Sequence, residues 1–261
     1  MPPGFEQFTT DLLAEVDSVE GYLSPREIRF LSLMAACPTA VGEILEIGSF
    51  KGKSTIILAK AAGLADGTVV NAVDPMTAPS ETDPDLHGAS SSLADFKRNI
   101  AEHGVESRIR FNQTFSYDLA KTWKTPLRLL WIDGDHTYAG TKLDVEGFVP
   151  HLSDKAIVAI HDVLHEFEGG ARVFAEKILG SPNFGAFGFC GSIAWAQFHA
   201  DARDATAHAS RKRAFTRKLE RLIPFSSHRG VTGFAKKKYK FYRWMIPHGP
   251  VDPDAWLGMV A

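Results

Sequence analysis

Apolar and mixed segments alternate along the chain from residue 43 onward. The near-continuous apolar pattern of buried strands covers residues 43–48, 68–74, 108–114, 127–133 and 156–162. Segments with helical spacing lie between them, at residues 54–65, 91–103, 116–121 and 138–152. Buried strands that are separated by helices predict a parallel sheet with helices on both faces.

Two further apolar segments, residues 184–189 and 191–198, follow one another with almost no chain between them. Because no helix separates these segments, they predict an antiparallel pair that closes the sheet. The predicted fold class is therefore α/β, with a doubly wound, mostly parallel seven-stranded sheet.

Helices are predicted before the first strand. Residues 5–19 carry spaced apolar side chains. Ser24, Pro25 and Glu27 then have the order of a capping box with proline at the first helical position, and the helix that they begin runs to about Ala36.

A long polar segment, residues 76–92, follows the second predicted strand. Loops of this length in a compact domain are often lids or binding loops, although a plain surface excursion has the same composition. Both interpretations stay open from the sequence.

Composition restricts the class of protein. The 261 residues are 44% hydrophobic and 23% charged, which is typical of one large globular α/β domain with appendages or of two small domains. Cys37 and Cys190 have no metal-binding spacing, and the first residues lack the basic and apolar regions of a signal peptide. We therefore expect a cytoplasmic protein.

Charge is unevenly distributed. The net charge is −2, but the segment from Arg211 to Arg243 contains twelve Lys/Arg residues and a single acid, Glu220. We predict a main domain of residues 1–200 and a basic, aromatic extension of residues 201–261. This extension has three alternative uses: packing or homo-oligomer contact, peripheral contact of residues 211–245 with the inner membrane face, and nucleic-acid binding, which the absence of an RNA-binding signature disfavours.

The segment GSFKGKST, residues 48–55, is similar to a phosphate-binding loop that lacks one residue. Such a loop has four residues between its first glycine and the Gly-Lys pair, whereas Gly48 and Gly52 are separated by three. Glu46 also precedes the loop, and a carboxylate repels a triphosphate. A P-loop kinase is therefore the disfavoured interpretation.

A second interpretation places Gly48 and Gly52 in the turn after the first strand of a doubly wound sheet. Asp74 ends the second strand, where an acid commonly binds the ribose hydroxyls of an adenosine-type ligand. A pyrophosphate cofactor such as NAD needs a third glycine in the loop and is incompatible with Glu46. A cationic sulfonium cofactor is compatible with this acidic residue.

Polar clusters follow two other predicted strands. Asp133, Asp135 and His136 end the segment LLWIDGDH, and His161 and Asp162 end AIVAIHD. The carboxyl ends of parallel strands meet at one sheet edge, so these side chains are expected to converge. Oxygen-rich ligands suit Mg²⁺, Ca²⁺ or Mn²⁺, and a histidine in the set shifts the preference towards a transition metal.

Taken in order, LEIGSFKGKST, AVDP, LLWIDGDHTYAGTKLDVEGFVPHL and AIVAIHDV resemble the class I S-adenosylmethionine-dependent methyltransferases. The similarity is to the branch of metal-dependent sugar and macrolide O-methyltransferases and cephalosporin-hydroxylase-like proteins, and covers roughly residues 24–198. It implies a Rossmann-like methyltransferase fold with S-adenosylmethionine as cofactor. The implied cofactor contacts are Glu46, Gly48, Ser49, Phe50, Gly52, Ser54, Asp74, Thr114, Ser116 and Asp133.

The resemblance also implies a catalytic site. Asp133, His161 and Asp162 match the positions that bind a divalent cation such as Mg²⁺, although His161 stands where an acid is frequent. His136 matches the general base of the sugar-modifying members. A sugar hydroxyl is a poor nucleophile until its proton is removed, and a metal ion together with an imidazole can achieve this.

The resulting expectation is transfer of a methyl group to a hydroxyl of a sugar, glycoside or related natural product. Two rivals stay open: metal-independent transfer with His136 as sole base, and a non-catalytic cofactor-binding scaffold. His165, Glu166 and Phe167 are candidates for contact with the acceptor, a small-molecule or glycan hydroxyl compound.

Overall fold

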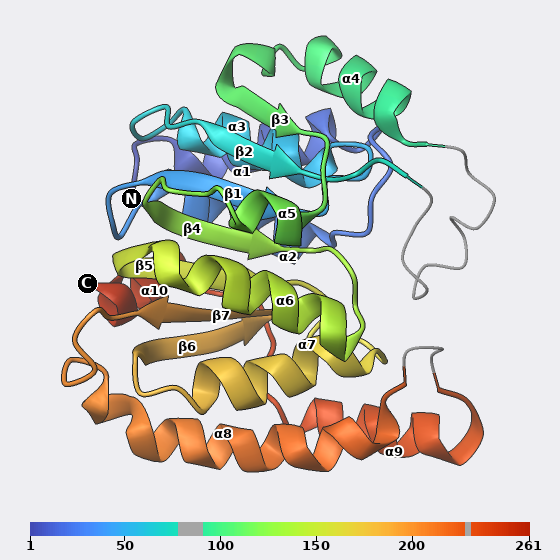
Figure 1. Cartoon of the computed structure of the whole chain (residues 1–261), viewed down its shortest axis with the longest axis vertical. Helices are drawn as coiled ribbons and strands as arrows, with labels where there is room; N and C mark the ends of the chain where they lie inside the picture. Colours follow the sequence, from blue (N-terminus) through green and yellow to red (C-terminus); the bar gives the residue numbers. More distant parts are fainter. Residues whose placement is uncertain (78–90, 228–230) are drawn as a thin grey trace.

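A seven-stranded sheet forms the centre of the computed structural model, which describes residues 1–77, 91–227 and 231–261 (Figure 1). The order is β3-β2-β1-β4-β5-β7-β6, in which β7 pairs antiparallel with both β5 and β6. This confirms the doubly wound, mostly parallel sheet and its antiparallel closing pair. The strands are β1 Glu43–Ile47, β2 Val70–Val73, β3 Ile109–Asn112, β4 Leu127–Ile132, β5 Leu152–Ile160, β6 Phe184–Cys190 and β7 Ile193–Phe198.

The chain order reverses between β1 and β4. These two strands pair directly, with Ile47 opposite Ile132, while β2 lies on the other side of β1. In open α/β sheets a crevice forms at such a switch point, outside the carboxyl ends of the strands. The topology therefore places the ends of β1, β2 and β4 around one potential site.

Helices cover both faces of the sheet (Figure 1). One hydrophobic cluster joins α1, α2, α3 and α10 to the sheet, and a second joins α6 to α9 to the other face. Within the described residues no helix is long and apolar enough to cross a bilayer. The helices are α1 Phe5–Glu15, α2 Pro25–Ala36, α3 Lys53–Ala62, α4 Leu93–Glu102, α5 Ser116–Ala120, α6 Tyr138–Phe148, α7 Glu168–Val173, α8 Ala209–Leu222, α9 Gly233–Trp244 and α10 Pro253–Val260.

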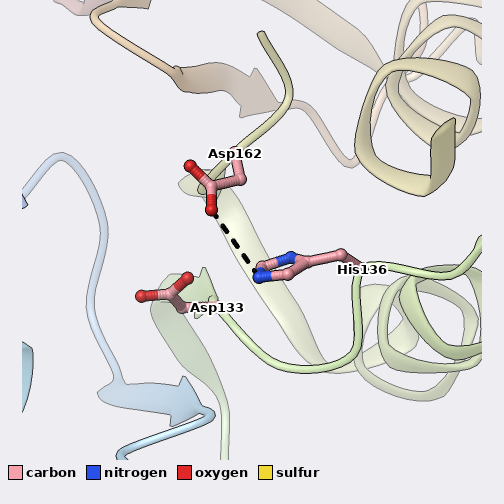
Figure 2. A group of neighbouring side chains, drawn as sticks. All are labelled: Asp133, His136 and Asp162. Carbon is pink, nitrogen blue, oxygen red and sulfur yellow. Dashed lines mark ion pairs between the residues drawn. The ribbon is translucent and has the colours of Figure 1, made fainter. Parts of the chain in front are cut away.

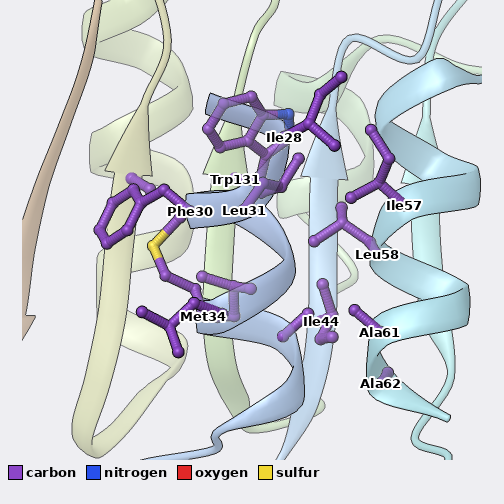
Figure 3. Close-up of a cluster of buried hydrophobic side chains, with 14 of the residues drawn as sticks. Ile28, Phe30, Leu31, Met34, Ile44, Ile57, Leu58, Ala61, Ala62 and Trp131 are labelled. Carbon is purple, nitrogen blue, oxygen red and sulfur yellow. The ribbon is translucent and has the colours of Figure 1, made fainter. Parts of the chain in front are cut away.

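Strand residues contribute alternately to the two clusters. In β4, Leu129 and Trp131 belong to the first cluster, and Leu130 and Ile132 to the second. Figure 3 shows the first cluster, where side chains of α2 and α3 pack against Ile44 and Trp131. Because β4 is buried on both faces, its sequence shows no polar alternation.

Several predicted boundaries differ from the structure. The helix predicted over residues 138–152 ends at Phe148, and a short 3-10 turn, Val149–His151, follows it. Pro150 has no N–H group to continue the helix, which explains the earlier end. After β5 the chain passes His165, Glu166 and Phe167, enters α7 at Glu168 and continues into a π-helix, Phe174–Leu179.

The capping box predicted at Ser24 and Glu27 is present at the start of α2. Most of the long polar segment predicted as a loop, residues 78–90 of 76–92, lies outside the described residues.

The basic extension packs on the rest of the molecule. Leu219 and Leu222 of α8 and Tyr239 of α9 are buried in the second cluster. Trp256 of α10 is fully buried in the first, with its ring edge-on to a tryptophan of β7 and a phenylalanine of α2. A boundary between units at residue 200 stays a prediction, and the packing of the extension is what the structure shows.

Candidate active site

A cavity of about 480 Å³ opens at the carboxyl ends of β1, β2 and β4, where the topology places a crevice. That volume is typical of small-molecule sites. Its lining includes five of the predicted cofactor contacts, namely Gly48, Phe50, Asp74, Ser116 and Asp133. The other five, Glu46, Ser49, Gly52, Ser54 and Thr114, do not line it.

Gly48 allows the turn after β1 to approach the end of β4. Its φ angle is +85°, and a Cβ at this position would collide with the backbone carbonyl of Asp133. Glycine adopts this left-handed conformation without strain, and it has no Cβ to prevent the approach. The first glycine of the loop therefore sets the distance between two walls of the cavity.

Asp74 connects the end of β2 to the glycine loop. Its Oδ2 accepts hydrogen bonds from the backbone N–H groups of Ser49 (2.9 Å) and Phe50 (3.0 Å). Its Oδ1 accepts from the N–H of Met76 at 2.7 Å. The carboxylate thus orders the loop while it lines the cavity, which is the place predicted for a ribose-binding acid.

Glu46 supports the loop from below. It is fully buried, and its Oε2 accepts from the hydroxyls of Ser49 (2.9 Å) and Thr55 (2.5 Å). Burial raises its pKa to about 7, although hydrogen bonds from Ser54, Thr55 and Ser49 oppose the shift. Glu46, Ser49 and Ser54 therefore form a buried network under the glycine turn, where the sequence suggested direct contact with the cofactor.

Asp133, His136 and Asp162 converge beside the cavity (Figure 2). One potential ligand atom from each lies within 4.8 Å of the others. His136 Nε2 is 3.6 Å from Asp162 Oδ2, and all three side chains are partly exposed. Asp133 lies in this cluster and also lines the cavity, so the two features share a wall.

His161 lies behind the cluster and is buried. Its Nδ1 is 2.8 Å from Asp133 Oδ1 and 3.5 Å from Asp162 Oδ1. Burial lowers the pKa of the ring, but the two carboxylates outweigh it and raise the pKa to about 10. Its Nε2 is buried without a partner among the described residues. The metal site predicted from sequence included His161, whereas the structure places His136 with the two carboxylates.

The segment after β5 brings aromatic rings to the cluster. Phe167 stacks on His136, with ring centroids 4.9 Å apart and an angle of 10° between the planes. His165 also stacks on Phe167, with ring centroids 4.9 Å apart and an angle of 26° between the planes. Glu166 instead forms an ion pair with Lys236 of α9, at 3.1 Å. Of the three predicted acceptor-side residues, two are therefore in the ring stack and one contacts the extension.

Comparison with known families now decides the class of the domain. Residues 45–163 match the family model described as "Methyltransferase domain", a span that contains the glycine loop, Asp74 and the Asp133–His136–Asp162 cluster. These residues form a methyltransferase domain. The resemblance to the class I S-adenosylmethionine-dependent methyltransferases is thereby confirmed.

Solved structures share the fold of this methyltransferase. The O-methyltransferase NovP has a TM-score of 0.58 and 14% identity, over 67% of this chain and 81% of its own. Cofactor-bound Rv0187 from MTB gives 0.55 and 20%, over 77% and 99%. An O-methyltransferase from Bacillus cereus, in complex with SAH, gives 0.51 and 20%, over 74% and 88%. At these identities the similarity shows the Rossmann-like fold.

Asp144 is a residue of the methyltransferase site that sequence analysis missed. It lies on α6, is 4% exposed and lines the cavity. Burial raises its pKa to about 7, while a 2.5 Å hydrogen bond from the Ser116 hydroxyl opposes this shift. An available signal was an acid among the core positions Val145 and Phe148 of the same helix.

Phe115 and Tyr117 also line the cavity; Phe115 belongs to the stretch Thr114 to Ser116 that the resemblance places beside the adenine, whereas Tyr117 was not predicted. Their rings are stacked with centroids 5.1 Å apart, and the two side chains are 46% and 42% exposed. Exposed aromatic rings beside a cavity provide flat surfaces on which a planar ligand group can stack.

Four non-glycine residues among the described residues have positive φ angles; Lys155 lies in β5 away from the cavity, and the other three lie at or near it. Phe50, Met76 and Asp162 have positive φ angles of 46°, 54° and 53°, and each lies just after a strand, β1, β2 and β5 respectively. Left-handed conformations are unfavourable for residues with a Cβ and tend to persist at functional sites.

Proposed function

We propose that this protein is an S-adenosylmethionine-dependent O-methyltransferase, acting on a hydroxyl of a sugar, glycoside or related natural product. The observation that carries the proposal is the double position of Asp133. It lines the cofactor-sized cavity and belongs to the carboxylate–histidine cluster. A methyl donor in the cavity and a hydroxyl at the cluster would therefore be adjacent. The sugar class of the acceptor rests on the motif resemblance.

The cavity walls suit the parts of the cofactor, which supplies an electrophilic methyl group on sulfur. Asp74 would accept hydrogen bonds from ribose hydroxyls, and Gly48 and Asp133 line the side that we assign to the methionine part. Ser116 and Phe115 line the side where an adenine ring would stack. These assignments account for four of the ten cofactor contacts expected from sequence, namely Gly48, Asp74, Ser116 and Asp133.

The cluster has a donor set that fits a divalent cation such as Mg²⁺ or Mn²⁺. Asp133 and Asp162 provide hard oxygen ligands, and hard cations prefer oxygen. His161 is positioned to orient Asp133, as residues behind a metal ligand commonly do. A cation held by the two carboxylates would lower the pKa of an acceptor hydroxyl.

His136 is the proposed general base. Its Nε2 lies 3.6 Å from Asp162 Oδ2, beside the carboxylates that would hold the cation. His136 would take the proton of the acceptor oxygen, and this oxygen would then bond to the methyl carbon while the carbon–sulfur bond breaks and leaves a neutral thioether. Phe167 stacks on the ring and restricts its rotation.

Titration calorimetry with S-adenosylhomocysteine tests the cofactor site. We expect binding by the native protein and at least about tenfold weaker binding by Asp74→Ala, which loses the ribose acceptor as well as the loop contacts. Absence of binding by the native protein at millimolar ligand would contradict the proposal.

Mn²⁺ titration, monitored by electron paramagnetic resonance, tests whether His136 is a ligand of the metal ion or the general base. Asp162→Asn is expected to weaken Mn²⁺ binding, because it removes a carboxylate of the cluster. Asp154→Asn serves as the matched control: Asp154 is an exposed residue near the start of β5, the strand that Asp162 follows. His136→Ala should keep the Mn²⁺ affinity and lose methyl transfer. A His136→Ala protein that binds Mn²⁺ as poorly as Asp162→Asn would make His136 a ligand, and the base would have to be sought elsewhere.

Metal-independent transfer is the second candidate, and one observation favours it. His161 Nδ1 already lies within 3.5 Å of oxygens of both Asp133 and Asp162, which a cation would also need. Methyl transfer that persists in excess EDTA, but is lost in His136→Ala, would support this candidate over the metal-assisted one.

A further inference from the structure

Helix α9 exposes an aromatic stripe. Phe234, Phe241 and Trp244 are 71%, 56% and 76% exposed. At 3.6 residues per turn, their spacing places them within roughly a quarter of the helix circumference. Monomeric proteins seldom expose large apolar side chains together on one face, so this stripe indicates an interaction surface.

Lysines flank the stripe. Lys237 lies within the same arc and is exposed, while Lys238 and Lys240 lie on either side of it. Lys238 Nζ is 4.8 Å from the centre of the Phe234 ring. The helix, GFAKKKYKFYRW, contains no acidic residue. The face therefore combines apolar rings with positive charge.

The opposite side of α9 is anchored to the methyltransferase domain. The Tyr239 hydroxyl donates a hydrogen bond to the backbone carbonyl of His165, and Lys236 pairs with Glu166. Tyr239 itself is 2% exposed. The helix is therefore held in a fixed orientation that turns the aromatic stripe outward.

Helix α8 adds charge on the same side of the molecule. Figure 1 shows α8 and α9 following one edge, beyond β6. Arg213, Arg217 and Arg221 recur every fourth residue and are exposed. Positive charge therefore extends well beyond the aromatic stripe itself.

We propose that the outer face of α9 docks on the surface of an anionic lipid bilayer. Aromatic side chains favour the membrane–water interface, where their rings enter the headgroup region. Lysines beside them extend towards anionic headgroups with their apolar stems against the rings. A single-stranded nucleic acid would need a basic groove, and the stripe lies on the convex outer surface of one helix.

Docking would bring the bilayer close to the candidate active site. The loop that α9 contacts through His165 and Glu166 also carries Phe167, which stacks on His136. Headgroups and this loop would then lie on opposite sides of one helix, about 10–12 Å apart. If the proposed function holds, this arrangement suits a hydroxyl acceptor that is anchored in the membrane.

Vesicle sedimentation with the full chain tests the docking. We expect pelleting with phosphatidylglycerol-containing phosphatidylcholine vesicles, little pelleting with phosphatidylcholine alone, and weaker pelleting at high salt. Trp244 fluorescence should shift to the blue on binding, because this exposed ring leaves water. Equal pelleting with both vesicle types, or no pelleting with either, would overturn the proposal.

Paired variants identify the surface. Lys237→Glu should weaken vesicle binding at least about fivefold, whereas Lys97→Glu, an exposed lysine of α4 at the opposite end of the molecule, should not. The triple variant Phe234→Ser/Phe241→Ser/Trp244→Ser should abolish pelleting and keep S-adenosylhomocysteine binding, which shows that it is folded.

Other occupants of the stripe give different results. If a second copy of the chain covers it, native protein without vesicles will sediment as a dimer and Lys237→Glu will shift it to monomer. If the partner is nucleic acid, the protein will bind a single-stranded oligonucleotide and will pellet with neither type of vesicle. Either result would overturn the bilayer proposal, and neither affects the test of cofactor binding.

Discussion

Two buried carboxyl groups lie near the cavity: Glu46 under the glycine turn, and Asp144 on α6 in the cavity wall. Burial is the largest cause of both pKa shifts, and hydroxyl donors compensate it only in part. Each is more easily protonated in the folded protein than in the unfolded chain. At the scale of single residues, the site is therefore built with groups that titrate near neutral pH.

Asp144 provides a test of this point through the pH dependence of stability. Its pKa is about 7 when folded and near 3.8 when unfolded, so the folded state binds more protons between these values. The native protein should lose stability as pH rises from about 4 to about 7. Asp144→Asn cannot ionise at this position and should not show the loss. The unfolding free energy of the variant minus that of the native protein should therefore increase by about 2–3 kcal/mol from about pH 5 to about pH 8.

Urea unfolding of both proteins at the two pH values measures this difference. Asp11→Asn, which changes an exposed carboxyl of α1, provides the baseline. A constant difference between Asp144→Asn and the native protein at all pH values would show that Asp144 is ionised in the folded state.

At the scale of elements, the turn between β1 and α3 needs a residue that adopts a positive φ angle and that lets the backbone approach the end of β4. Gly48 and Gly67 both have positive φ angles, but a Cβ at Gly48 would meet the Asp133 carbonyl, and one at Gly67 has no atom within 4 Å. The pair therefore separates backbone strain from the requirement for space.

Gly67→Ala should cost about 1–2 kcal/mol of unfolding free energy, the usual penalty of a left-handed alanine. Gly48→Ala should cost about 1–3 kcal/mol more, because the turn must also move away from β4. It should in addition weaken S-adenosylhomocysteine binding, which Gly67→Ala should not. Urea unfolding and calorimetry check both; equal effects of the two substitutions would refute the close approach.

At the scale of the whole molecule, helix α10 near the C-terminus packs in the same hydrophobic cluster as the N-terminal helices α1 and α2. α10, near the C-terminus, inserts Trp256 between α2 and β7, where Phe30 and Trp195 contact it with ring centroids 6.1 and 5.8 Å away. The core of the sheet is thus completed by the last helix of the basic extension.

Trp256→Ala should therefore destabilise the protein by about 3–5 kcal/mol, the usual cost of removing a buried tryptophan. Trp244→Ala, which removes the same side chain from an exposed position of α9, should change stability by about 0.5 kcal/mol or less. Urea unfolding compares the two. Similar values would mean that α10 does not pack as a part of the core.

The sequence alone was sufficient to predict the strands, their mostly parallel directions with an antiparallel closing pair, and the sheet edge at which polar residues gather. The near-continuous apolar strands and the glycine in the turn after β1 can each be recognised from a short stretch of sequence, because each depends on the environment of a single element. The same holds for Asp74 and Asp133, which follow directly from their positions at strand ends.

Only the tertiary structure decided which side chains meet. It turned Glu46 and Ser54 away from the cavity, brought Asp144 into its wall, and placed His161 behind Asp133. It also buried one side of α9 and exposed the other. These outcomes depend on contacts between residues that are far apart in the chain. A short stretch of sequence does not predict in which direction such side chains point. The positions of strand ends are determined by sequence, and the partners of each side chain by packing.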